Sequence, residues 1–289
     1  MNRREEILDI VSKVVALPSC VGKASSLLEN NVEDFAKLAR IIEHDPGLTA
    51  NLLKMVNASA IARRHPIQTT RDALCWLEAP DILQFVISTG LAPTYVRTID
   101  GYDQSPGMYL QQSVAVAIAA CKLGKALGVS FPAYTYTAAL LAGVGKLVLG
   151  TYVKVDMHRL MSKVLEENLP FDKAEDAVLG INHAEIGEFL LKRWGLPPEI
   201  TDVVRYHLRP DDYAGESLVL DLVHVGNLLA KLIGVGLGAD GLNYDLSTNS
   251  IERLGVTPEI ADRVSAEVVT ELGGLWDLFV ECVDRVCVL

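Results

Sequence analysis

Hydrophobic residues recur at helical spacing along almost the whole chain, and this periodicity restricts the fold more than any other feature. Near the N-terminus, one helical face collects Ile7, Leu8, Val11, Val14 and Val15. Residues three and four apart lie on the same side of a helix, so such a face packs against a core. Stretches that alternate between apolar and polar residues, as a half-buried strand requires, are absent at useful length. The sequence therefore predicts an all-α fold, a multi-helix bundle with no sheet of consequence.

One helix is expected at the centre of this bundle. Ser105 and Pro106 form a helix start, Gly128 follows its end, and residues 114–120 in its middle are apolar on every side. A helix without a polar face belongs inside a bundle. The same spacing predicts further helices over residues 70–78, 80–89, 132–152, 156–167, 172–179, 183–194, 198–207 and 217–233, and from Thr257 and Pro258 onward.

Two loop-rich stretches divide the chain into three expected parts. They are an N-terminal helical subdomain over 1–104, a helical core over 105–240 and a C-terminal extension over 241–289. The extension is acidic, with 3 basic against 9 acidic side chains and a net charge of −6. It also carries an apolar stripe formed by Ile260, Val264, Val268 and Leu272. Such a stripe either docks on its own domain or binds a partner, and we expect docking because an exposed stripe would make the protein insoluble.

Charge and composition restrict the compartment and the partners. The chain has 289 residues, half of them hydrophobic, and 26 Lys and Arg against 37 Asp and Glu give a net charge of −11. The negative charge of the chain repels the phosphate backbone of nucleic acids, so no nucleic acid partner is expected. The longest apolar stretches are too short for a membrane span of about 20 residues or are interrupted by Lys146. Five cysteines without a CxxC pair indicate a reducing compartment. We expect a cytoplasmic protein that does not bind membranes.

Several short strings suggest enzyme chemistry, but each lacks a necessary residue. Residues 143–147 resemble the end of a phosphate-binding loop, yet Leu140 and Leu147 stand where that loop needs glycine and a hydroxyl. His183-Ala184-Glu185 resembles half of a zinc deaminase site, but no Pro-Cys-x-x-Cys follows. Asn182 and Glu185 instead have the spacing of a helix capping box. The six histidines include no pair at i and i+4, so no local metal site is predicted.

Three stretches, taken in order, carry a family resemblance. Residues 42–58 contain Asp45-Pro46-Gly47-Leu48-Thr49 at a helix start, residues 113–121 and 138–147 form a second match, and residues 182–207 form a third. Together they resemble the HDOD proteins, bacterial signalling proteins whose "HD-related output domain" is related to the HD phosphohydrolases. The resemblance implies an N-terminal helical subdomain followed by a degenerate HD-like helical core.

The resemblance also implies that the metal site of the HD enzymes has been lost in this chain. Active HD enzymes bind their metal through one histidine on an early helix, an adjacent His-Asp pair and a later aspartate. These four positions correspond in this chain to Gln112, Ala142, Gly143 and Asn227. None of these residues has an imidazole or a carboxylate, which are the ligands that such a metal needs. We therefore expect no catalytic residue, no bound metal and no cofactor.

Four more residues surround the vestigial pocket that the resemblance implies: Lys146, His183, Arg205 and His207. The two histidines look like the auxiliary histidines of two-metal relatives. Lys146 and Arg205 are either phosphate contacts or ordinary surface and ion-pair residues. The expected function is a non-catalytic module that contacts other signalling proteins, with a homodimer left open. The alternatives are a nucleotide-sensing module that uses the pocket and a residual metal-dependent phosphohydrolase.

Overall fold

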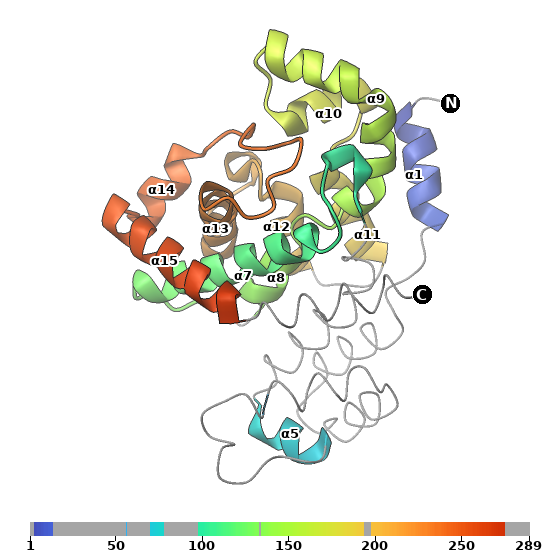
Figure 1. Ribbon diagram of the computed structural model, residues 1–289. Helices are drawn as coiled ribbons and strands as arrows, with labels where there is room; N and C mark the ends of the chain where they lie inside the picture. The colour runs from blue at the N-terminus through green and yellow to red at the C-terminus, as the bar shows by residue number, and fades with distance from the viewer. Residues whose placement is uncertain are drawn as a thin grey trace. The chain divides into compact units, whose positions relative to one another are not determined.

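The computed structural model describes residues 3–13, 56, 70–77, 98–132, 134–193 and 198–274. Within these ranges the regular elements are helices, and the extended pairing is a single bridge between Ile99 and Gln104 (Figure 1). The predicted all-α fold is therefore confirmed. The helix predicted over residues 80–89 lies outside the described residues, as does the stretch 42–58 with its helix start, apart from Val56, which is helical and buried.

The chain divides into two compact units. One unit is Val15–Ala92, and its described part includes helix α5 (Thr70–Trp76). The other unit joins Met1–Val14 to Pro93–Leu289, so helix α1 (Arg3–Lys13) belongs with the later part of the chain. The boundaries expected at residues 104 and 240 lie in loop-rich stretches of the sequence. The observed units instead group the helices that pack together.

Helix α7 (Met108–Ala126) is the central helix of the larger unit, and residues 114–120 on it are each no more than 5% exposed. Three helices pack against α7: α8 (Thr135–Leu141), α13 (Leu218–Leu232) and α15 (Pro258–Gly274) (Figure 1). A Cβ added at Gly226 of α13 would lie 2.8 Å from the backbone nitrogen of Ala120. The two backbones therefore touch, which only a glycine allows.

The structure corrects the helix predicted over residues 132–152. The chain forms α8 and then α9 (Lys146–Glu166), with a turn at 142–145 between them. The predicted gap between 152 and 156 is instead a kink within α9 at Asp156, whose φ of −102° and ψ of 15° are not helical. The turn brings the Gly145 backbone against the start of α11, where a Cβ at Gly145 would lie 1.9 Å from the carbonyl oxygen of His183. Periodicity along one segment does not reveal such a contact.

The segment Ala138–Glu166 is long and apolar enough to cross a membrane by length and composition. Of its most apolar window, however, 67% is buried inside the unit. This degree of burial is typical of the core helix of a globular domain.

The remaining described helices are α10 (Phe171–Leu179), α11 (His183–Arg193), α12 (Pro198–Tyr206) and α14 (Thr248–Leu254), with short 3-10 turns at Asp100–Tyr102 and Pro210–Asp212. The predicted cap of α11 is present, since the Glu185 amide donates to the Asn182 side-chain oxygen at 2.9 Å. The Glu185 carboxylate, in contrast, accepts a hydrogen bond from Arg4 of α1. The sequence analysis missed α14, which begins at a Ser247 cap inside a stretch expected to be loop.

The apolar stripe of α15 docks within the larger unit. Val264 and Val268 are fully buried where α15 packs on α7. Lys122 of α7 adds an ion pair, with its ammonium nitrogen 2.9 Å from Glu271. The aromatic residues that follow, from Trp276 onward, lie outside the described residues. Docking is thus observed for the part of the acidic extension that the structure describes.

Candidate functional site

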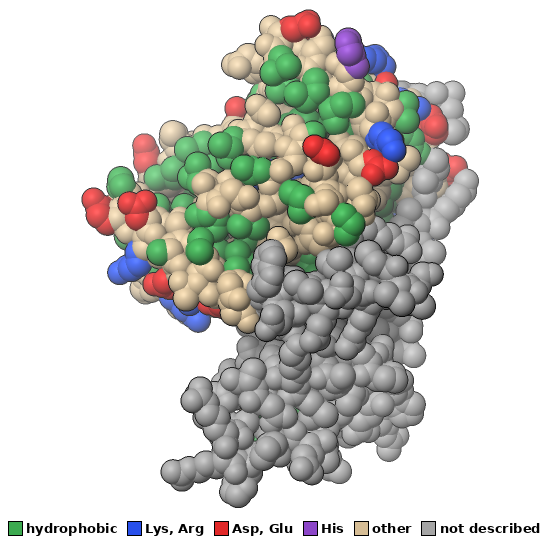
Figure 2. Space-filling view, in the orientation of Figure 1, with side chains coloured by type: hydrophobic (Ala, Val, Ile, Leu, Met, Phe, Trp, Pro, Cys, Tyr) green, Lys and Arg blue, Asp and Glu red, His purple; other side chains and the backbone are tan. Residues whose placement is uncertain are grey.

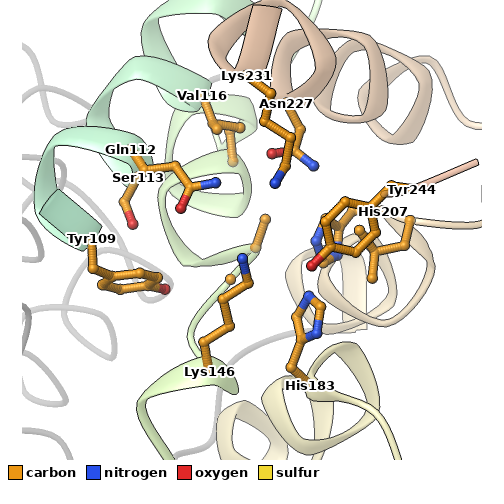
Figure 3. Close-up of a pocket in the computed structure, with 14 residues that line it drawn as sticks. Tyr109, Gln112, Ser113, Val116, Lys146, His183, His207, Asn227, Lys231 and Tyr244 are labelled. Carbon is orange, nitrogen blue, oxygen red and sulfur yellow. The ribbon is translucent and has the colours of Figure 1, made fainter. Parts of the chain in front are cut away.

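A small cavity lies in the larger unit between the central helix α7, the α8–α9 turn and helices α11 and α13 (Figure 3). Its volume is about 20 Å³, which is room for about one water molecule. Seven of the eight residues named from the family resemblance line it: Gln112, Ala142, Gly143, Lys146, His183, His207 and Asn227. Five separate segments of the chain therefore bring these residues together.

Gln112 on α7 and Asn227 on α13 face this cavity from neighbouring helices, and both are neutral amides (Figure 3). Ala142 and Gly143 lie in the α8–α9 turn below them. A Cβ at Gly143 would lie 3.1 Å from the hydroxyl oxygen of Tyr109. A side chain of aspartate size therefore does not fit at position 143 unless Tyr109 moves.

Arg205 does not line the cavity. Its side chain is 30% exposed and forms ion pairs on α11, with Glu188 at 3.4 Å and Glu185 at 3.7 Å. Successive helical residues are about 100° apart, so a residue two positions before His207 points to a different side. The structure thus corrects the placement of Arg205 as a pocket residue and gives it the ion-pair role.

His183 is held in one orientation by a buried carboxylate. Both its backbone nitrogen and its Nδ1 lie within hydrogen-bond distance of the same Glu175 oxygen, at 3.0 and 2.8 Å, and Tyr102 donates to the other oxygen. Burial raises the pKa of Glu175 to about 8. Burial and then the Lys146 ammonium lower the pKa of His183 to about 3. His183 is therefore a neutral imidazole near neutral pH.

His207 faces His183 across the cavity, with ring centroids 6.0 Å apart. Its Nδ1 donates to the Val204 carbonyl oxygen at 2.8 Å, so Nε2 carries the lone pair. Burial, followed by the influence of His183, lowers the pKa of His207 well below its ordinary value. Both imidazoles at the cavity are therefore neutral.

A buried cluster that the sequence analysis missed adjoins the cavity. We call it the lysine cluster, and it consists of Lys146, Lys231, Asp240 and Tyr244. One Asp240 oxygen, Oδ2, lies 2.7 Å from the Lys146 ammonium and 3.1 Å from the Lys231 ammonium. The Tyr244 hydroxyl donates to the same oxygen at 2.8 Å. Both lysines and Tyr244 line the cavity, whereas Asp240 lies behind them.

The charges of the lysine cluster shift the pKa values of its members. Burial by itself would raise the pKa of Asp240, but the ammonium groups of Lys146 and Lys231 lower it far below the ordinary value. Burial lowers the pKa of Lys231 to about 8, although Asp240 opposes this shift. The Lys231 ammonium also lies 4.4 Å from the centroid of the Tyr244 ring. The cluster thus places the Asp240 carboxylate between two lysine side chains in the interior.

One sequence signal could have found part of this cluster. Lys231 is four residues after Asn227, so the two share a face of α13. Asp240 gives no such signal, because it lies in an irregular connection rich in glycine. In the part of the chain that the structure describes, no group of three or more His, Cys, Asp or Glu is arranged to hold a metal ion.

Comparison with known proteins agrees with this architecture. The model of one protein family, described as the HDOD domain, matches residues 14–210. The chain belongs to the HDOD family. The match spans well over half of the chain and ends in the segment that follows His207.

Solved structures share the HDOD fold over most of this chain. An HDOD domain protein with unknown function from Geobacter sulfurreducens is 21% identical, with 98% of each chain covered and a TM-score of 0.65. A protein from Shewanella amazonensis SB2B named "Putative phosphohydrolase" is 19% identical, with 91% of this chain and 97% of that chain covered and a TM-score of 0.63. At this identity the likeness concerns the fold.

Two relatives are longer than this chain. A protein from Marinobacter aquaeolei VT8 named "Putative signal transduction protein" is 20% identical with a TM-score of 0.68, and the match covers 98% of this chain and 61% of that one. A protein of Treponema pallidum (strain Nichols), named "Uncharacterized protein", is 24% identical over 202 residues. That match covers 70% of this chain and 39% of the relative.

Proposed function

We propose that this HDOD protein is a non-catalytic module of signal transduction that works through contacts with other signalling proteins. The family membership and the named Marinobacter relative support the signalling role. The observation that carries the non-catalytic part is the chemistry of the cavity lining. The homodimer considered from the sequence stays open in this proposal.

The residues around the cavity do not fit a divalent metal. The positions that would supply its ligands hold two neutral amides, an alanine and a glycine. Divalent ions in HD enzymes need imidazole and carboxylate ligands. The ammonium groups of Lys146 and Lys231 line the same cavity and would repel a cation. The nearby Asp240 carboxylate offsets only one of these two positive charges, so the cluster keeps a net positive charge.

The same lining disfavours both alternative functions. Phosphate ester hydrolysis in this class of enzyme needs a metal-bound hydroxide, and no set of ligands for it is assembled among the described residues. A nucleotide needs a cavity of several hundred Å³, whereas this one has about 20 Å³. Arg205, the second candidate phosphate contact, points elsewhere.

Metal analysis and activity assays test the non-catalytic part. Protein expressed with added manganese and iron, then desalted, should contain far less than about one metal ion per chain. It should also hydrolyse neither a phosphomonoester nor a cyclic dinucleotide above the rate of a His183→Ala/His207→Ala control. A stoichiometric metal that this double variant loses, together with turnover by the native chain, would contradict the proposal.

Exposed apolar side chains support the interaction part. Leu232, Leu237, Leu242 and Leu246 are 38–59% exposed at the end of α13 and in the connection that follows it. Figure 2 shows hydrophobic side chains gathered on this face, with most charged side chains towards its margins. Apolar surface of this kind is typical of sites of protein contact. A photo-crosslinking residue at position 242 should capture another signalling protein in cells, and one at the exposed Glu259 on α15 should not. Equal capture from both positions, or none from either, would contradict this part.

A further inference from the structure

Three hydrogen-bond donors converge on a single buried oxygen in this structure. The donors are Lys146 on α9, Lys231 on α13 and Tyr244, and the oxygen is Oδ2 of Asp240. Asp240 is fully buried and both lysines are at most 4% exposed. Convergence of several donors, two of them charged, on one oxygen is the geometry that proteins use to bind an oxyanion.

The carboxylate reaches these donors from an irregular connection that is itself held in place. We call residues 233–247, between α13 and α14, the strap. The Ala239 amide donates to the Tyr102 carbonyl at 2.7 Å, and the Phe171 amide donates to the Asn243 carbonyl at 2.7 Å. A Cβ at Gly238 would lie 1.9 Å from the Tyr102 carbonyl oxygen, so only glycine permits this approach. The strap is therefore anchored on both sides of Asp240.

The two oxygens of the Asp240 carboxylate differ in their hydrogen bonding. Asp240 Oδ1 is buried and has no hydrogen-bond partner among the described residues, so the carboxylate is bound through Oδ2 alone. Two buried ammonium groups, in contrast, require a negative partner, because an uncompensated buried charge is very costly. The two lysines therefore need an anionic oxygen beside their ammonium groups, whether this chain or another molecule supplies it.

We propose that Lys146, Lys231 and Tyr244 form an oxyanion-binding site, that Asp240 is its built-in occupant, and that a small carboxylate from solution binds there once the Asp240 side chain is removed. The site takes a carboxylate because that is the group whose shape and charge it encloses. The inference concerns these donors only and holds whether or not the proposed function is correct.

Chemical rescue of an Asp240→Ala variant of the full chain tests the site, with sodium formate as the probe. In sodium chloride the variant should melt below the native protein. Replacing chloride by formate at the same ionic strength, up to about 0.2 M, should raise its melting temperature saturably by about 3 °C or more. The native protein should not respond, because its own carboxylate is held at a very high effective concentration.

Matched variants separate specific binding from a general salt effect. Asp245→Ala removes an exposed carboxylate from the same strap, one that pairs with Lys173 at the surface, and should show no response to formate. Asp240→Ala/Lys231→Met removes one donor and should lose the response. Asp240→Asn fills the space with a neutral amide and should also fail to respond.

The outcomes decide the proposal in either direction. If Asp240→Ala is unfolded in chloride, recovery of the folded signal in formate supports the site, and failure to recover overturns it. A folded Asp240→Ala that responds equally to formate and chloride also overturns it. So does an equal response to formate in the double variant.

Discussion

At the scale of single residues, burial dominates the chemistry of this protein. Glu175 and His183 share a hydrogen bond in the interior, yet burial favours the neutral form of each. At Asp240 the effect of burial on the pKa is overcome because two ammonium groups are in direct contact with the carboxylate. The difference follows from the partners: Glu175 contacts a phenol and an imidazole, whereas Asp240 contacts two ammonium groups.

The raised pKa of Glu175 predicts that the contribution of this residue to stability falls as the pH rises from 6.5 to 8. In this window the folded protein keeps a proton on Glu175, with a pKa of about 8, which the unfolded chain, with a value near 4.5, has released. His183, which is neutral in the folded protein, contributes with the opposite sign near pH 6.5, where the unfolded imidazole still binds part of a proton. In urea titrations, Glu175→Gln should make the slope of the unfolding free energy against pH more positive than that of the native protein by up to about 1.4 kcal/mol per pH unit.

The exposed Glu166→Gln is the control for this measurement and should keep the native slope. If Glu175→Gln and the native protein lost stability in parallel between pH 6.5 and 8, Glu175 would be ionised in the folded protein.

A second prediction concerns the difference between buried and exposed ion pairs. Asp240→Asn leaves two buried ammonium groups without a negative partner, and breaking a buried ion pair in this way costs about 3 kcal/mol or more. Lys173→Met removes the partner of Asp245 at the surface, where both side chains are about half exposed, and should cost no more than about 0.5 kcal/mol. Equilibrium denaturation of both variants measures the difference, and equal losses would show that the buried pair contributes no more than the exposed one.

At the scale of elements, tertiary contacts decide where helices begin and how they pack. In the turn between α8 and α9, the backbone of Gly145 touches the start of α11. Helix α15 follows the sequence pattern more simply, since the stripe predicted to be buried is the one that faces α7. Its orientation can be tested with two neighbouring valines.

Val268 is fully buried against α7, whereas the next residue, Val269, is 54% exposed. Val268→Ala should lower the free energy of unfolding by about 1–2 kcal/mol, since it removes buried methyl groups and leaves a small cavity. Val269→Ala should change it by less than about 0.5 kcal/mol. Thermal or urea denaturation compares them directly. A larger loss for Val269→Ala would mean that α15 docks by its other face.

At the scale of the whole molecule, charge governs which partners are accessible. The chain carries a net charge of −11 with a sequence pI near 5.0. We therefore propose that it does not bind nucleic acid. Such a charge repels phosphate backbones through the long-range field of the protein.

Fluorescence anisotropy with labelled duplex DNA tests this at about 0.15 M salt, where micromolar protein should give no binding. The same titration at low salt should also stay flat, because an acidic protein releases few counterions from DNA. Salt-dependent binding with a steep slope would contradict the proposal and point to a basic surface hidden by the average charge.

Much of the helical architecture could be predicted from the sequence alone. Helical spacing predicts α7 and α10 to α13 closely, because periodicity and caps such as Asn182 act within a few residues. The family resemblance named seven residues that do line one cavity. These features depend on residues close in sequence or on positions that match the family, so they can be predicted from a single sequence.

Only the tertiary structure decided the chemistry of that cavity. Asp240 meets Lys146 although 94 residues separate them, and no local pattern in the strap predicts this contact. Arg205 points away from the cavity and forms ion pairs with acidic side chains on α11. Both outcomes depend on which charges the fold brings within a few ångströms of each other in a low dielectric, and this proximity is a property of the packed helices rather than of any segment.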